Sequence, residues 1–142
     1  MDIVARYRAY ADAFEETYLD DDWSRLAPFF TENACYSPGQ QSASGRDATL
    51  DLLKRGIDGF DRRMDSREVE FFNHTAQGNE VHVDWRATYR KSGLPELSFG
   101  AREIAVFEGD RIAELREVWE PAVEAQLQAW MMEHADKLQD NG

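Results

Sequence analysis

The sequence is poor in the features that mark several large classes of protein. Among its 142 residues Cys35 is the single cysteine, so the chain cannot form an internal disulfide, which is typical of the reducing cytoplasm. No apolar run approaches the ~20 residues of a membrane span, and residues 1–6 lack the apolar core of a signal peptide. Repeats, linkers and low-complexity tracts are also missing. We therefore expect one cytoplasmic domain over residues 1–142.

Basic residues are scarce relative to acidic ones. Sixteen Lys and Arg residues stand against 28 Asp and Glu residues, which gives a formal net charge of −12. Proteins that bind a phosphate backbone carry the opposite sign, so we expect neither nucleic acid nor a membrane as a partner. The hydrophobic content of 42%, with 12% aromatic residues, indicates a folded globular domain rather than a disordered chain.

The first part of the chain has the periodicity of helices. Residues 3–19 carry apolar side chains at every third or fourth position, which predicts an amphipathic helix. The acidic run 20–22 interrupts this pattern and offers an N-cap for a short second helix, which Pro28 should kink or shorten. Residues 34–37 are a candidate strand. Ser44, with an aspartate three residues later, resembles a capping box and predicts a third helix that reaches about residue 64.

From residue 67 the period changes to two. Turn signals separate four runs, which predict an antiparallel meander: Val69–His74, Val81–Arg90, Glu96–Phe107 and Arg111–Trp119. Pro121 opens a final helix that extends to about residue 139, and its apolar side is either a lid or a surface for dimer packing. The fold class is therefore α+β, with helices packed on one face of a curved antiparallel sheet.

Each of the last two strands carries one carboxylate within its apolar face. On the first strand this face holds Phe99, Ala101, Glu103, Ala105 and Phe107. On the second it holds Ala113, Leu115, Glu117 and Trp119. A carboxylate that is buried, charged and unpaired is costly, so such a group is usually paired, protonated or functional. Glu103 and Glu117 therefore predict a small-molecule site, and the alternative is a structural network with Arg86, Arg102 or Arg116.

The strand at 81–89 allows two assignments. Its apolar phase contains Trp85, and its polar phase contains Asp84 and Arg86. A shift of one residue exchanges the two faces of a strand, so either phase can line a pocket. We favour Trp85 inward and keep Asp84 as a further candidate.

Several short segments, in this order and at these spacings, resemble the corresponding segments of one known superfamily. They are Phe29–Ala34, Ser44–Asp47, and Glu103–Ile112 continuing to Trp119–Pro121. The chain is similar over residues 3–122 to the nuclear-transport-factor-2-like superfamily, which includes ketosteroid isomerases, limonene-epoxide hydrolases and SnoaL-like polyketide cyclases. The resemblance implies a cone-shaped, cystatin-like fold with a curved mixed or antiparallel sheet. It also implies a deep apolar pocket and a homodimer built on the outer face of the sheet.

The resemblance assigns candidate roles to individual residues. Glu103 falls where ketosteroid isomerases keep a protonated acid and where SnoaL-like cyclases have an acid/base residue. The isomerase's base would fall near Ser37 or Pro38 and its oxyanion tyrosine at Phe14, so that mechanism is not expected. Glu117 and Asp84 match two acids of the epoxide-hydrolase triad, whose arginine position holds a histidine.

Together these observations predict a cofactor-independent acid/base enzyme that acts on a small, largely apolar, oxygen-bearing molecule. Cyclisation, isomerisation, dehydration and epoxide opening all suit this chemistry. The catalytic candidates are Glu103, Glu117 and Asp84. The candidates that bind the substrate are Trp85, Arg86, Trp119, Phe14, Tyr18, Tyr36 and Phe60. No metal or cofactor is expected. The alternative function is a non-catalytic module of the same fold that binds a small ligand or another protein.

Overall fold

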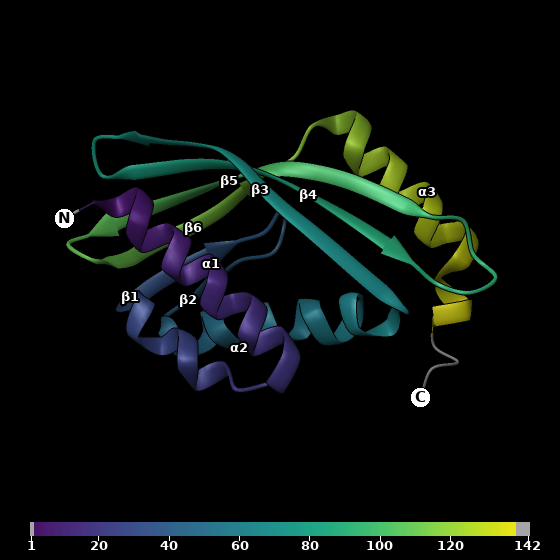
Figure 1. Ribbon diagram of the computed structural model, residues 1–142, viewed down its shortest axis with the longest axis horizontal. Helices are drawn as coiled ribbons and strands as arrows, with labels where there is room; N and C mark the ends of the chain where they lie inside the picture. Colours follow the sequence, from purple (N-terminus) through teal and green to yellow (C-terminus); the bar gives the residue numbers. More distant parts are fainter. Residues whose placement is uncertain (1, 139–142) are drawn as a thin grey trace.

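A curved sheet organises the fold, and helices pack against it (Figure 1). The structure is a computed structural model that describes residues 2–138. Its helices are α1 (Ile3–Asp20), α2 (Arg46–Gly59) and α3 (Pro121–Leu138), with 3-10 helices η1 (Trp23–Phe29) and η2 (Asp61–Arg63). Its strands are β1 (Phe30–Ser37), β2 (Ala43–Ser44), β3 (Ser66–Gln77), β4 (Glu80–Arg90), β5 (Leu97–Glu108) and β6 (Arg111–Val118).

The six strands form one mixed sheet in the order β2-β1-β6-β5-β4-β3. Strands β3 to β6 are the predicted antiparallel meander. Strand β1 pairs with β6 in parallel and with β2 in antiparallel orientation. The meander predicted from the sequence did not include these two pairings. The predicted α+β fold with helices on a curved mixed sheet is confirmed.

Three local predictions about helix ends need correction. No side-chain cap comes from Ser44, because it lies in β2 and the residue before α2 is Gly45 with φ +98°. Helix α2 ends at Gly59, short of the expected residue 64, and the chain continues as η2. Asp22 precedes η1 without accepting a backbone capping bond. Pro28 does lie in a short helix, which is a 3-10 helix. The final helix is described to Leu138, so expected residue 139 lies outside the described part.

Two groups of buried residues fill the space between the sheet and the helices. The first joins α1, α2 and β1 to the part of the sheet around Val83 and Ala105. The second joins α3 to the ends of β4 and β5, where Leu138 and Trp130 pack with Tyr89 and Leu97. Because Val81, Val83, Trp85, Ala87 and Tyr89 belong to these two groups, the apolar phase of β4 faces the helices, as favoured from the sequence.

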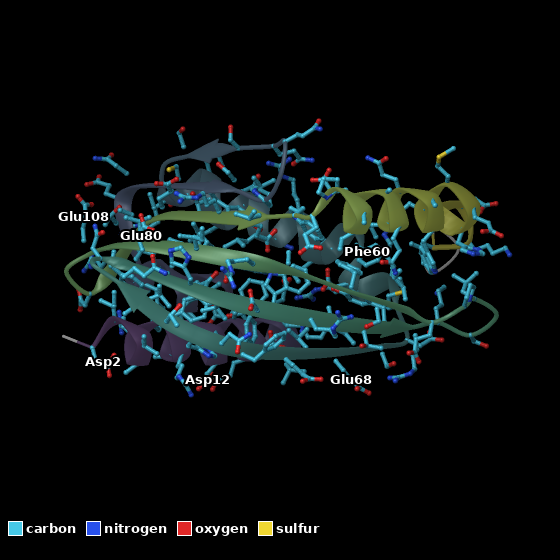
Figure 2. The ribbon with its side chains drawn as sticks, turned by 90° about the horizontal axis from the view of Figure 1, so that it is seen from above. Asp2, Asp12, Phe60, Glu68, Glu80 and Glu108 are labelled. Atoms are coloured by element: carbon cyan, nitrogen blue, oxygen red, sulfur yellow. The ribbon has the colours of Figure 1, made fainter. Side chains whose placement is uncertain are left out.

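Side chains cover both faces of the sheet along its length (Figure 2). At one point β4 and β5 approach so closely that only glycine fits. A Cβ atom at Gly100 would lie 2.3 Å from the Trp85 carbonyl oxygen, well inside contact distance.

Candidate functional site

A cavity of about 610 Å³ lies between the sheet and the three α-helices. Most of its wall is apolar and aromatic, with contributions from α1, α2, the four long strands and Leu127 of α3. Four exposed residues, Gln40, Gln41, Arg55 and Gly56, also border the cavity and mark where it meets solvent. Such a volume suits a small organic molecule, since ligand pockets typically measure about 300–1,000 Å³.

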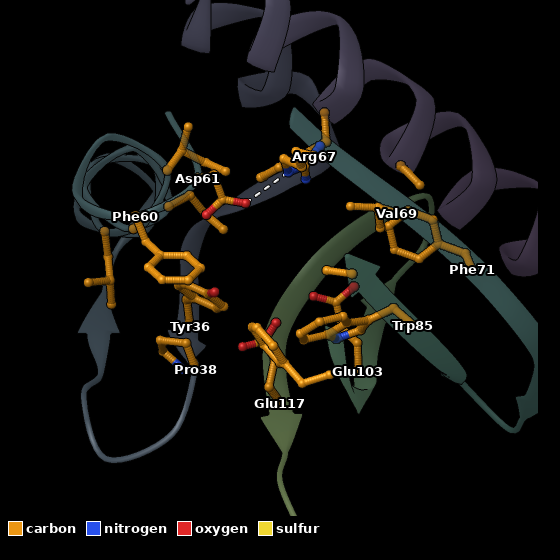
Figure 3. A pocket seen from close by; sticks show the side chains of 18 of the residues that line it. Tyr36, Pro38, Phe60, Asp61, Arg67, Val69, Phe71, Trp85, Glu103 and Glu117 are labelled. Atoms are coloured by element: carbon orange, nitrogen blue, oxygen red, sulfur yellow. Dashed lines mark hydrogen bonds and ion pairs between the residues drawn. The ribbon is translucent and has the colours of Figure 1, made fainter. Parts of the chain in front are cut away.

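The polar centre of the cavity is a pair of glutamates on neighbouring strands. Glu103 of β5 and Glu117 of β6 are direct partners in the antiparallel register. Directly opposite residues place their Cβ atoms about 4.5–5.5 Å apart on the same face. Both side chains line the cavity, beside Trp85 (Figure 3). The strand alternation that placed both acids in apolar stripes thus brings them to one site.

Burial and mutual repulsion change the acidity of this pair. Burial raises the pKa of Glu103 from 4.5 to about 7, although a hydrogen bond donated by the Tyr7 hydroxyl acts in the opposite direction. Burial also raises the pKa of Glu117 well above its usual value, and the charges of Glu103 and Asp61 raise it further. Because two adjacent buried carboxylates repel each other, the pair retains a proton near neutral pH. Because the Tyr7 hydroxyl stabilises the ionised form of Glu103, the proton of the pair is favoured on Glu117.

Tyrosines surround the glutamate pair. Burial raises the pKa of Tyr7, Tyr10 and Tyr36, and the neighbouring glutamates raise it further. All three therefore stay neutral at physiological pH and act as hydrogen-bond donors or acceptors rather than as bases. Tyr7 holds the Glu103 carboxylate from the helix side of the cavity.

A second polar group lies on another part of the cavity wall, across from the glutamates (Figure 3). Asp61 of η2 accepts hydrogen bonds from Arg67 Nε and from the Tyr89 hydroxyl, both at 2.8 Å. Arg67 also contacts both carboxylate oxygens of Glu15, at 2.6 and 3.3 Å. Burial raises the pKa of Asp61, and Arg67 and Tyr89 oppose that change.

Five of the seven residues predicted to bind the substrate line the cavity: Phe14, Tyr36, Phe60, Trp85 and Trp119. The two tryptophans meet edge to face, with ring centroids 5.5 Å apart, and form a wall beside the glutamates. Phe60 contacts Trp130 of α3 at 6.3 Å between centroids, so α2 and α3 meet at one end of the cavity. The roles of these residues in binding stay predictions.

Three predicted site residues lie elsewhere. Asp84 is on the opposite face of β4, where it bonds to Arg102 at 2.9 Å and to Asn73 at 3.0 Å. Arg86 shares that outer face and contacts Ser98. Tyr18 is absent from the cavity wall, because its ring packs under the Arg67 guanidinium, 4.5 Å from the centroid. The apolar phase of β4 takes the inner face, which turns the polar phase outward.

This placement also removes two interpretations of the glutamates. Asp84 and Glu117 project from opposite faces, so the epoxide-hydrolase pair that the resemblance suggested does not form. Within residues 2–138 neither glutamate forms an ion pair with the arginines of the structural alternative, because Arg102 pairs with Asp84, Arg116 pairs with Glu114 and Arg86 contacts Ser98. Glu103 instead accepts a hydrogen bond from the Tyr7 hydroxyl.

Sequence reasoning missed four polar residues of the cavity: Tyr7, Glu15, Asp61 and Arg67. Tyr7 carried a usable signal, since it shares a helix face with Phe14 and its hydroxyl needs a partner when buried. Asp61 and Arg67 carried none, because each lies in a polar stretch that looks exposed when read alone.

The described residues also bear on two other features, a metal site and a membrane-spanning helix. Residues 2–138 contain no group of three or more His, Cys, Asp or Glu side chains placed to hold a metal ion. Over the same part of the chain, no helix combines the length and the apolar character needed to cross a membrane.

Comparisons with known proteins agree on the family and the fold. The family model of the SnoaL-like domain matches residues 7–115. Bal32a, from a soil-derived mobile gene cassette, has a TM-score of 0.67 and 16% identity over 91% of this chain and 99% of its own. An LEH-like epoxide hydrolase from M. tuberculosis has a TM-score of 0.63 and 18% identity over 86% of this chain and 84% of its own.

A third solved structure, a putative polyketide cyclase from Sinorhizobium meliloti, has a TM-score of 0.61 and 15% identity over 78% of this chain and 94% of its own. No curated protein matches this chain. Similar structures also include NTF2-like and cystatin-fold proteins. The match to the SnoaL-like domain model confirms the predicted family, and these structures agree with its fold. At these identities the structural likeness shows the fold alone.

Proposed function

This chain belongs to the SnoaL-like domain family, and from that premise we propose that it is a cofactor-independent acid/base enzyme. Its substrate would be a small, largely apolar molecule that carries an oxygen atom at the reacting centre. The observation that supports this proposal is the Glu103–Glu117 pair, which faces an apolar cavity and shares a proton near neutral pH.

The two glutamates suit opposite roles. Glu103 is the base, because the Tyr7 hydroxyl stabilises its ionised form. Glu117 is the acid, because burial and the nearby charges hold its proton. General acid/base catalysis is most effective when the pKa of the group lies near the working pH. Pairs of titratable groups whose environments separate their pKa values are typical of such assignments.

One reaction step illustrates the proposed chemistry for a carbonyl substrate. Glu103 removes a proton from the carbon next to the carbonyl, while Glu117 gives its proton to the carbonyl oxygen, and an enol forms. For a β,γ-unsaturated ketone the enol is a dienol. Glu103 then gives its proton to the γ carbon while Glu117 takes back the O–H proton, which restores the carbonyl and completes an isomerisation. In a cyclisation the enol carbon attacks a second carbonyl carbon, whose oxygen takes the proton from Glu103 while Glu117 takes back the O–H proton. In both reactions the total charge of Glu103 and Glu117 is the same at the enol stage as at the start, because one glutamate has gained a proton and the other has lost one.

The same pair can serve substrates whose carbon–oxygen bond breaks. Glu117 would protonate the departing oxygen of an alcohol or epoxide, and Glu103 would take a proton from the neighbouring carbon or from water. The range of reactions among similar folds supports this breadth, since one is described as a putative polyketide cyclase and another as an LEH-like epoxide hydrolase. The walls of Trp85 and Trp119 would exclude bulk water from the reacting atoms.

The test is a turnover assay with a defined panel: cyclic β,γ-unsaturated ketones, terpene epoxides and β-hydroxy ketones. We expect the native protein to convert at least one of them. Glu103→Gln and Glu117→Gln should each reduce kcat by about 10²–10⁴-fold, the usual contribution of a general acid or base. Glu108→Gln, at the exposed end of the same strand, is the matched control and should retain full activity.

The alternative is a non-catalytic module that binds a ligand in the same cavity. Binding that survives Glu103→Gln, with no turnover of any panel member, would favour this alternative. Full activity of Glu103→Gln would remove that residue as the base.

A further inference from the structure

The cavity holds a second polar position whose hydrogen-bonding capacity is only half used. Asp61 Oδ2 accepts both the Arg67 Nε bond and the Tyr89 hydroxyl bond, each at 2.8 Å. Both of these side-chain donors bond to Oδ2, and no other side chain of residues 2–138 directs a hydrogen bond to Oδ1. The Asp61 side chain is 13% exposed and lines the cavity, where Figure 3 shows it opposite Glu103 and Glu117. One oxygen is therefore anchored while the other remains available to a ligand.

Neighbouring charges restrict what this oxygen can bind. The Arg67 guanidinium is itself occupied, because its terminal nitrogens contact Glu15 and its Nε contacts Asp61. It therefore offers no free cationic surface to an anion. An anionic group placed here would lie near Asp61, Glu15 and the glutamate pair, and like charges in a buried site repel strongly. Arg67 supplies one positive charge against the two carboxylates of Asp61 and Glu15, so the cluster favours a hydrogen-bond donor. A hydroxyl donates that bond without the desolvation cost of moving a ligand ammonium into the apolar cavity.

We propose that Asp61 binds a hydroxyl group of the substrate, at a distance from the reacting oxygen that the glutamate pair contacts. The inference rests on the proposed function and specifies its substrate class. That class is a neutral molecule with an apolar skeleton, a reacting oxygen at one end and a hydroxyl donor at the other. Tyr89 and Arg67 are positioning residues, since they hold the carboxylate in the orientation that leaves Oδ1 open.

Measurements of ligand binding test the proposed role of Asp61, and they do not require that the reaction be known. The probes are 4-cyclohexylcyclohexanol, its methyl ether and 4-cyclohexylcyclohexanecarboxylate, which share one skeleton and differ in the polar group. Isothermal titration calorimetry measures the affinity, and a change in the tryptophan fluorescence, to which Trp85 and Trp119 in the cavity wall contribute, supports occupancy of the cavity. A hydrogen bond to a charged acceptor favours the alcohol by about tenfold or more. We therefore expect the alcohol to bind at least about tenfold more tightly than the ether or the carboxylate.

A pair of variants locates the effect. In Asp61→Asn the amide oxygen takes the bonds from Arg67 and Tyr89, so the amide NH₂ group replaces Oδ1 and becomes a donor. The preference for the alcohol over the ether should then fall to about one or reverse. Asp58→Asn is the matched control, because Asp58 is exposed, pairs with Lys54 and is not part of the cavity wall. It should keep the native preference.

Two results would overturn the inference: equal binding of the alcohol and ether by the native protein, or an undiminished preference in Asp61→Asn. The ranking in the native protein decides the matter even where Asp61→Asn does not fold. Failure of the inference about Asp61 can be distinguished from failure of the proposed function. An absent preference together with turnover that Glu103→Gln abolishes removes the role of Asp61 alone. A clear preference without turnover retains the role of Asp61 and removes the enzyme.

Discussion

Replacing Glu103 by glutamine should change how the stability of the protein depends on pH. The glutamine side chain has nearly the same shape, and its amide oxygen can still accept the Tyr7 bond. The amide does not titrate, however. Any difference in the pH dependence of unfolding between the two proteins therefore reports the burial of the Glu103 carboxyl group.

The direction and size of the effect follow from the raised pKa. The folded protein binds this proton more tightly than the unfolded chain, because burial raises the pKa from 4.5 to about 7. Its stabilising contribution is complete below pH 4.5 and is lost as the pH rises through 7. A pKa rise of this size corresponds to a change of about 3 kcal/mol in the free energy of unfolding across this pH range. That is a substantial part of the roughly 5–15 kcal/mol that stabilises a typical domain.

Urea unfolding at several pH values between 4 and 8, followed by tryptophan fluorescence, measures the effect. We expect the free energy of unfolding of Glu103→Gln, relative to the native protein, to rise by about 3 kcal/mol from pH 4 to pH 8. Glu108→Gln controls for the loss of one acidic residue at the exposed end of β5. Parallel curves for the native protein and Glu103→Gln would refute the claim that Glu103 is buried with a raised pKa.

Three other predictions concern the hydrogen bond, the strand contact and the assembly. Tyr7→Phe removes the hydrogen bond that lowers the pKa of Glu103. Because the proposed base must be ionised, the pH of half-maximal activity on the acidic side of the pH profile should rise. Gly100→Ala forces a Cβ atom against the Trp85 carbonyl and should lower the free energy of unfolding by about 2 kcal/mol or more, measured in urea. The chain should form a dimer through the outer face of its sheet, and Phe72→Asp, on that face, should yield monomers by sedimentation.

Each of these predictions has a result that contradicts it. An unchanged pH profile in Tyr7→Phe would mean that the bond does not control Glu103. Gly56→Ala is the control for Gly100→Ala, since its Cβ would meet nothing within 4 Å and alanine favours a helix. Equal losses in both glycine variants would exclude a contact-specific effect. A monomeric native protein at micromolar concentration would contradict the dimer.

The part of the site that could be predicted from the sequence is the part that depends on strand alternation. Glu103 and Glu117 each break an apolar stripe, and a period of two places both on the buried face. Their pairing was not readable from the turn between β5 and β6, because it depends on a register shift between Val106 and Phe107. Without that shift Glu103 would lie opposite Arg116 instead of Glu117. On β4 the alternation was equally clear, but the choice between Asp84 and Trp85 depended on which face the helices cover.

The remaining residues depend on contacts between distant segments. Tyr7 and Glu103 are 96 positions apart, and nothing local to either residue indicates the other. Arg67 reaches Glu15 across 52 positions, so a stretch that looks exposed in the sequence becomes part of a buried cluster. The failed capping box at Ser44 has a local cause instead, because Gly45 adopts a positive φ and redirects the chain before α2 begins.

Helix α3 bounds the cavity without taking part in the strand pairing of the sheet. The SnoaL-like match ends at residue 115, whereas Leu127 and Trp130 lie beyond it, on a helix that pairs with no strand. Changes in the length or side chains of α3 can therefore enlarge or narrow the cavity without altering strand register or the Glu103–Glu117 spacing. In such an arrangement the choice of substrate can diverge between related proteins while the acid/base chemistry stays constant.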